Sequence, residues 1–377
     1  MRAVVDGAGT SRLDRLTIAR KEGWKALVEA PPKVQPEQLS RSELAGLAPE
    51  AKAIRDRDLR FWHANLGPIK TPQLEELHHE MADIFESEDP KAGDLVKGAM
   101  AVEGFPGLGK TTAVLAFAKE MHRRTIAEEG TLTEEGHERW PVARVGLTGN
   151  TGMKDFNKAL LDFYGHPGTN GTTSEMGKRA LDCVLMCDTR LLIIDDLHFL
   201  QWRKTGGMEV SNHFKYIANE FPIVLLFIGV GLRARGLFSE GESEADTVIA
   251  QTGRRSTPLV LKPFTIADEA GRRAWRNMLL ALEQRLVLVD KHPGMLADDL
   301  SDYLFARSTG HIGSLMTLIN RGCQRALRTG LERLDADLLD KVKIDAAAEA
   351  GRAELELALQ SGRLRSKPRQ GRAIAVG

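Results

Sequence analysis

The hydrophobic positions follow two different patterns along the chain. In the first part, five short apolar runs alternate with longer segments that have helical periodicity. Runs that are apolar on both faces are typical of strands buried in a parallel sheet. Strands that alternate with helices in this way predict an α/β fold with right-handed crossovers. The strands are expected at residues 98–103, 142–147, 191–194, 223–228 and 259–261.

Helices are expected between these runs, and beyond residue 267 only helical periodicity remains. Residues 125–139 are charged and weakly patterned, which indicates an insertion. The change after residue 267 predicts a small helical lid domain. The helices of the first part are expected at 71–87, 112–124, 154–164, 174–188 and 210–220, and those of the lid at 268–289, 298–308, 312–329 and 335–359.

The two ends of the chain differ from its middle. Residues 1–60 are rich in charge and carry Pro31, Pro32 and Pro36, which predicts one or two short helices and an extended linker outside the main core. Residues 361–377 are basic and poor in large apolar groups, so we expect a disordered tail. The predicted organisation is an N-terminal extension at 1–60, an α/β domain at 61–266, a helical lid at 267–360 and the tail.

Composition adds little to this picture but excludes some classes. The chain has 377 residues, 42% hydrophobic and 28% charged, with a formal net charge of +0, as in an ordinary globular protein. No apolar run approaches the roughly 18 residues that a membrane span needs, and the N-terminus lacks an apolar signal core. The three cysteines suit a reduced compartment. We therefore expect a cytoplasmic protein without a membrane partner.

The strongest chemical signal is GFPGLGKT at residues 104–111, which follows an expected strand and opens an expected helix. It matches the phosphate-binding loop pattern G-x-x-x-x-G-K-[ST] in full. Glycines let backbone N–H groups converge on phosphate oxygens, the lysine neutralises the β- and γ-phosphates, and the threonine hydroxyl binds Mg²⁺. The nucleotide-binding residues expected here are Gly104, Gly107, Leu108, Gly109, Lys110, Thr111 and Thr112.

A second signal is LLIIDD at residues 191–196, an apolar strand that ends in two carboxylates. Ligands of open α/β sheets bind at this carboxyl edge. Asp195 is expected to hold Mg²⁺ together with Thr111, and Asp196 to orient or polarise the attacking water. An aspartate at the second position is one methylene shorter than a glutamate, so slow hydrolysis is expected.

These motifs resemble AAA+ ATPases, and more narrowly the TniB/TnsC family of transposition regulators. The resemblance rests on the phosphate-binding loop, IIDDLH at 193–198, TGRRSTPLVLKPF at 252–264, GHIGSL at 310–315 and the lead-in FWHANLGPIKTPQLEEL at 61–77. It implies a P-loop AAA+ domain with a central parallel sheet, followed by a small helical lid, with ATP and Mg²⁺ as cofactors. The lead-in resembles the segment that contacts adenine in this group.

The resemblance also implies a homo-oligomer, either a ring or a helical filament, that hydrolyses ATP at its subunit junctions. Arg254 and Arg255 fall where the family places the arginine that reaches a neighbour's γ-phosphate, although a solvated surface pair is the alternative. Two family features are missing. The strand at 223–228 does not end in a polar residue, and GHIGS at 310–314 lacks the lid arginine. Both departures put fast turnover in doubt.

In the TniB/TnsC family, loops track the duplex backbone without reading bases. The matching positions here supply Lys154, Arg203 and Lys204, with solvated charged loops as the alternative. The function expected is therefore an ATP-dependent regulator of DNA transposition that assembles on duplex DNA, independently of sequence, and recruits or activates a transposase. The alternatives are a signalling or defence-type NTPase switch that acts on protein partners, and a helicase-loader-type ATPase.

Overall fold

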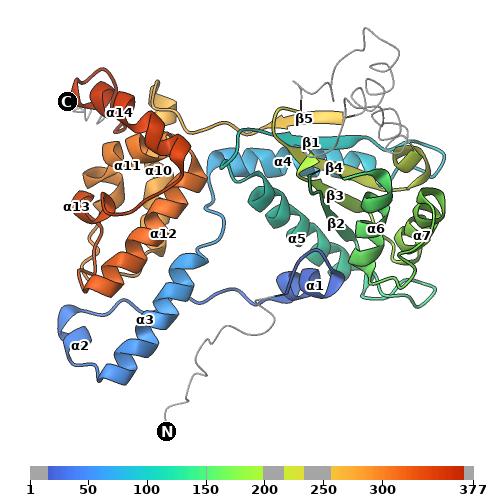
Figure 1. Cartoon of the computed structure of the whole chain (residues 1–377), viewed down its shortest axis with the longest axis horizontal. Coiled ribbons are helices and arrows are strands. Elements are labelled where there is room, and N and C mark those ends of the chain that lie inside the picture. The colour runs from blue at the N-terminus through green and yellow to red at the C-terminus, as the bar shows by residue number, and fades with distance from the viewer. Residues whose placement is uncertain (1–15, 150, 198–215, 233–255, 369–377) are drawn as a thin grey trace, which may run out of the picture.

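The computed structural model describes residues 16–149, 151–197, 216–232 and 256–368. One part of the molecule is built on a sheet of five parallel strands in the order β2-β3-β4-β1-β5 (Figure 1). The α/β fold with a central parallel sheet and a helical C-terminal region is thereby confirmed. The strands are β1 Ala99–Glu103, β2 Val142–Gly146, β3 Leu191–Asp195, β4 Val224–Gly229 and β5 Ser256–Val260.

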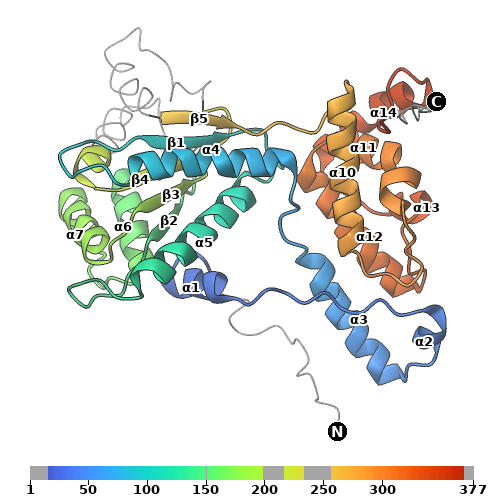
Figure 2. The same cartoon turned by 180° about the vertical axis from the view of Figure 1, so that it is seen from behind.

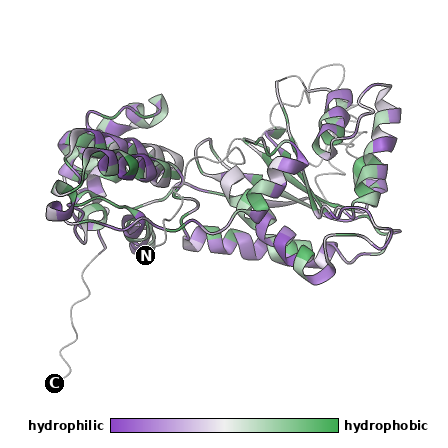
Figure 3. Cartoon of the chain, turned by 90° about the horizontal axis from the view of Figure 1, so that it is seen from below, coloured by the Kyte–Doolittle hydropathy of each residue, from purple (hydrophilic) through white to green (hydrophobic). Residues whose placement is uncertain are grey.

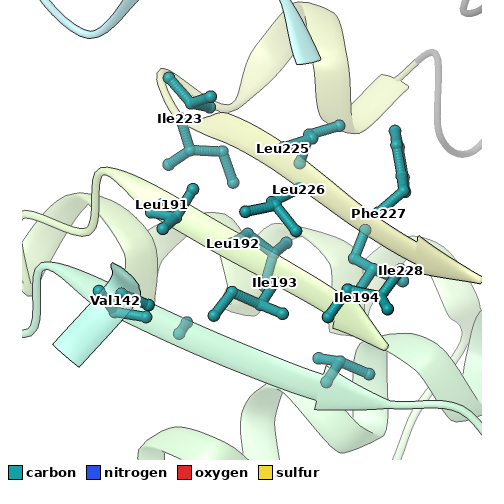
Figure 4. Close-up of a cluster of buried hydrophobic side chains, with 14 of the residues drawn as sticks. Val142, Leu191, Leu192, Ile193, Ile194, Ile223, Leu225, Leu226, Phe227 and Ile228 are labelled. Atoms are coloured by element: carbon teal, nitrogen blue, oxygen red, sulfur yellow. The ribbon is translucent and has the colours of Figure 1, made fainter. Parts of the chain in front are cut away.

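The sheet is buried because its strands are apolar on both faces. β3 and β4 are buried at every position, and their aliphatic side chains pack against one another (Figure 4). Such strands belong in the middle of a sheet, where helices cover both faces. The helices of this part are α4 Pro72–Glu88, α5 Lys110–Glu129, α6 Met153–Tyr164 and α7 Thr173–Met186, and residues 216–220 are also helical.

Helix α5 is longer than its periodicity suggested. It continues to Glu129 and ends at Gly130, whose φ of 83° is favourable only for glycine. Thr125 lies buried within it and donates its hydroxyl to the Met121 carbonyl at 3.1 Å. The expectation that an insertion begins at residue 125 is therefore wrong for residues 125–129, because charged residues cover the outer face of a helix that is buried on its other side.

The C-terminal helices have a hydrophobic core of their own. The single helix expected at 335–359 is wrong, because two helices are found and Asp345 caps the second by accepting from the Ala348 N–H at 3.0 Å. Buried Arg307 donates to the carbonyls of Leu339 and Val342, which lie between the two helices or at their border. The elements are α10 Glu269–Arg285, η3 Met295–Asp299, α11 Ser301–Ser308, α12 Ile312–Thr329, α13 Ala336–Leu339 and α14 Ala346–Gln360.

The N-terminal segment forms α1 Lys21–Glu29, α2 Arg41–Ala45 and α3 Pro49–Ala64. The expectation that it lies outside the main core is wrong. Trp24 is fully buried in the core of the α/β part, and its indole N–H donates to His122 Nδ1 at 3.1 Å. Burial lowers the pKa of His122 to about 4, so its imidazole is neutral at pH 7 and can accept this bond.

The same segment then crosses to the C-terminal helices (Figures 1 and 2). Arg41 pairs with Asp290, and Arg55 pairs at 2.8 Å with Glu332, which is buried. Trp62 donates its indole N–H to the Arg285 carbonyl at 2.7 Å. The N-terminal segment is therefore attached to both parts of the molecule.

The helices carry both hydrophilic and hydrophobic residues (Figure 3), as expected of amphipathic helices around a core. Within the described part of the chain, no helix has both the length and the apolar character that crossing a bilayer requires.

Candidate functional site

The loop at residues 104–109 joins β1 to α5, and its glycines are required by its shape. A Cβ on Gly104 would lie 2.7 Å from the Leu261 carbonyl oxygen. Gly107 and Gly109 both have a φ of 77°, which other residues rarely adopt. Gly109 caps α5 without any side-chain hydrogen bond, so the first N–H groups of the helix stay available to an anion.

Lys110 opens α5 and points back over the loop. Its ammonium donates to the carbonyls of Gly104 and Phe105, each at 2.9 Å. Burial lowers the pKa of Lys110, while the charges of Asp196 and Asp195 oppose this shift. The structure therefore brings together the loop cation and the two carboxylates, as the sequence predicted.

Thr111 and Asp195 meet across the gap between α5 and β3. The threonine hydroxyl donates to Asp195 Oδ1 at 3.2 Å, and the carboxylate is almost fully buried. Hydroxyl and carboxylate oxygens are the ligands that Mg²⁺ prefers. These two residues therefore fit the Mg²⁺ site predicted for them, next to a loop built to hold phosphate.

Asp196 follows β3 in a left-handed conformation with a φ of 59°. Its backbone N–H donates to Asp195 Oδ1 at 3.0 Å, and the residue is exposed. Aspartate and asparagine tolerate this conformation better than most residues. A position that combines unusual backbone geometry with exposure at the site edge suits a group that acts on a solvent molecule.

Arg144 is a site residue that the sequence analysis did not identify. It lies on β2 beside β3, and its Nη2 donates to Asp195 Oδ2 at 2.7 Å. Its Nε is buried with no hydrogen-bond partner in the described part of the molecule. A lone charge in an otherwise apolar strand is the signal that marks it, because a buried charge needs a partner.

We expect Arg144→Met to destabilise the ligand-free protein by about 3 kcal/mol, because the buried Asp195 carboxylate loses its counter-charge. Mg²⁺ with a non-hydrolysable ATP analogue should restore more stability to this variant than to the wild type, since a cation again faces the carboxylate. Thermal denaturation with and without the ligand measures both effects.

Arg124→Met is the matched control, because Arg124 pairs with Glu86 and both side chains are about half exposed, at 49% and 55%. An exposed pair contributes about 0–1 kcal/mol. Equal loss of stability in the two variants would contradict a specific role for Arg144 at Asp195.

A pocket of about 400 Å³ lies beside the loop. Its walls come from the segment after α3, the start of α5, the segment after β5, and α12. A pocket of this volume, with apolar walls and a few polar groups, has the size and character of small-molecule sites. Among its lining residues are Leu66, Ile69, Thr112, Leu261, Met316 and Asn320.

The lid contacts the phosphate-binding loop through a backbone hydrogen bond. The Gly313 N–H donates to the Gly107 carbonyl at 2.7 Å, and a Cβ on Gly313 would lie 2.7 Å from the same oxygen. No side chain fits at this position, where the AAA+ resemblance predicted a lid arginine. The next residue, Ser314, donates its hydroxyl to Asp345 at 2.6 Å within the lid. The missing lid arginine is thus replaced by a close backbone contact.

Of the other predicted site residues, the structure describes only Lys154. Lys154 is exposed in the first turn of α6, which follows β2 and its loop. Arg203, Lys204, Arg254 and Arg255 lie outside the described residues. β4 ends at Gly229 without a polar side chain, as noted from the sequence.

Comparisons with known proteins agree with this geometry. Residues 95–238 match the model of the AAA domain. A solved structure of the ORC1 protein of Aeropyrum pernix in complex with DNA has a TM-score of 0.51 at 18% identity and covers 81% of this chain and 71% of its own. That of CDC6P from Pyrobaculum aerophilum has a TM-score of 0.49 at 12% identity, with 80% and 83% covered. No curated protein matched.

The family model places an AAA domain in this chain, and AAA domains are in general nucleotide-hydrolysing ATPase domains. The ORC1 similarity, at an identity this low, shows that the chain shares the AAA+ fold. The broader part of the sequence-based resemblance is therefore confirmed. Membership of the TniB/TnsC family stays a prediction.

Proposed function

We propose that this protein is an ATP-dependent, DNA-binding regulator of DNA transposition. In this proposal ATP drives assembly into a ring or helical filament on duplex DNA, the assembly recruits or activates a transposase, and slow hydrolysis dismantles it. The observation that carries the ATPase part is the convergence of Lys110, Thr111, Asp195 and Asp196 at one edge of the sheet, beside a pocket. The motifs shared with TniB/TnsC proteins support the transposition part.

Each residue at the site has a different role in this proposal. The N–H groups at the start of α5 and Lys110 bind the phosphates, and the neighbouring pocket accepts the nucleoside. Thr111 and Asp195 would hold Mg²⁺, which supplies charge neutralisation at the β- and γ-phosphates. Asp196 accepts a proton from, or orients, the water that attacks the γ-phosphate. Arg144 keeps the Asp195 carboxylate in place.

With a non-hydrolysable ATP analogue, the protein should form rings or filaments that bind duplexes of unrelated sequence. Each phosphate neutralised contributes about −0.9 to the slope of log affinity against log salt on B-DNA, so binding should weaken steeply with salt. Alanine at Lys154, Arg203 and Lys204 should flatten the slope by up to about three units. Electron microscopy and a salt titration test these outcomes.

Nucleotide binding by the triple variant is the internal control, because Lys154 lies on α6 after β2, and β3 and β4 separate β2 from β1 and its phosphate-binding loop. ATP-loaded wild type that ignores duplex DNA at low salt would rule out the transposition role. That outcome would favour the signalling switch that acts on proteins alone.

A further inference from the structure

The second half of α12 carries a row of cations. Arg321, Arg325 and Arg328 are spaced by four and three residues, so they lie on one face of the helix. Three further cations lie nearby, and we call the set of six the lid basic face: Arg60, Arg321, Arg325, Arg328, Lys341 and Lys343. Five of these side chains are exposed and Arg325 is half-buried.

Two neighbouring segments complete the lid basic face. The guanidinium of Arg321 donates to the Lys343 carbonyl and that of Arg325 to the Lys341 carbonyl, so residues 341–343 run alongside α12. On α3, the Arg60 carbonyl accepts from Gln324 Nε2 at 3.1 Å. The contacts between α12, α3 and α13 agree with their places in Figures 1 and 2. Backbone carbonyls position these arginines but do not neutralise them.

The lid basic face has no counter-charge in the described part of the chain, where none of its six side chains forms an ion pair. Three carboxylates close to it in sequence are engaged elsewhere. Glu332 pairs with Arg55, Asp335 with Arg333 and Asp340 with Arg352. In a chain with a formal net charge of +0, this leaves a local excess of positive charge.

The same helix reaches the nucleotide pocket. Gly313 in the first turn of α12 contacts the phosphate-binding loop, and Asn320, directly before Arg321, lines the pocket. A helix rises about 1.5 Å per residue, so Arg321 lies about 12 Å along the axis from Gly313. One rigid element therefore joins the pocket and the phosphate-binding loop to the lid basic face.

We propose that the lid basic face binds the phosphate backbone of duplex DNA, as a contact surface separate from the loops of the α/β domain. From Arg321 to Arg328 the axis extends about 10 Å, a length over which a duplex presents on the order of six phosphate charges at about one per 1.7 Å. Arginine and lysine contacts to phosphate carry no base information, so the binding is independent of sequence. This inference rests on the proposed function and adds a surface to it.

The test is a quadruple variant with alanine at Arg321, Arg325, Lys341 and Lys343. Loaded with a non-hydrolysable ATP analogue, it should bind a duplex at least about tenfold more weakly than wild type at low salt. Its log–log salt slope should be smaller by up to about 3.6, which is four times the −0.9 per phosphate. Fluorescence anisotropy measures both quantities.

A second variant distinguishes loss of DNA contacts from misfolding of the quadruple variant. Lys341→Glu with Lys343→Glu leaves the hydrogen bonds of Arg321 and Arg325 to backbone carbonyls intact, and it should weaken DNA binding while nucleotide affinity is unchanged. The matched control is Arg20→Ala with Lys178→Ala. These two exposed cations form no ion pair within the described residues and lie outside the lid. This control should bind DNA as wild type does.

The outcomes separate the two proposals. If the wild type binds duplex DNA and the lid variants bind with unchanged affinity and slope, the lid basic face is not a DNA surface and the proposed function stands. The same conclusion follows if the control variant loses as much affinity as the lid variants. If ATP-loaded wild type binds no duplex, both proposals are wrong.

Discussion

Replacing Lys110 by alanine should weaken nucleotide binding on the order of 100-fold or more. The Lys110 ammonium is the only cation of the loop sequence, and it lies 2.9 Å from two loop carbonyls at the place where the phosphates bind. Charge-assisted hydrogen bonds contribute roughly 1.5–3 kcal/mol each. Loss of two such bonds amounts to about 3 kcal/mol or more, which lowers the affinity on the order of 100-fold. Calorimetric titration with Mg²⁺ and an ATP analogue measures this loss.

The matched control is Lys119→Ala, a change of the same kind on the same helix, nine residues further along α5. It should leave nucleotide affinity unchanged. Thermal denaturation without ligand should give similar melting temperatures for wild type and Lys110→Ala, since the bonded carbonyls belong to a loop that solvent reaches. An ATP affinity of Lys110→Ala within a factor of two of the wild-type value would contradict the assignment of residues 104–111 as a phosphate-binding loop.

Asp196→Asn should suppress ATP hydrolysis by roughly 100-fold or more and leave ATP binding intact. A neutral amide cannot accept the proton of the attacking water, and general-base catalysis contributes typically about 10²–10⁴-fold. Asparagine is the appropriate replacement because the residue has a φ of 59°, and asparagine tolerates this backbone conformation as aspartate does. Nucleotide-driven assemblies should therefore persist longer in the variant. Steady-state phosphate release measures the rate.

Asp188→Asn is the control for the same chemical change. Asp188 is another aspartate with positive φ, at 48°, and it pairs with Arg139 at the opposite end of β3 from Asp196. Its turnover should match that of the wild type. Undiminished phosphate release by Asp196→Asn would move the catalytic role to another group.

Most of the phosphate site could be predicted from the sequence because it is encoded by neighbouring residues. In GFPGLGKT, glycine spacing determines the loop conformation and places the lysine and threonine at the start of a helix. The apolar run before Asp195 similarly predicts a buried strand with carboxylates at its end. The contact between Thr111 and Asp195 follows once β1, which precedes the loop, and β3, which ends at Asp195, are placed in one parallel sheet.

Three features could not be predicted in this way. Arg144 and Asp195 are 51 residues apart and pair because β2 lies next to β3. Trp24 is buried against α5, although the segment around it is charged. The contact of Gly313 with the loop depends on where the lid docks. Periodicity shows which face of an element is apolar, but not which distant element covers it.

The sequence by itself determined the α/β class, the phosphate-binding loop and the carboxylate pair, because backbone conformation and local charge depend on residue type and spacing. Only the tertiary structure decided which charges are paired, which segment bridges the two cores, and which face of α12 has no ion-pair partner among the described residues. Those properties depend on the packing of segments far apart in the chain, where burial sets whether a charge must find a partner or can stay free for a ligand.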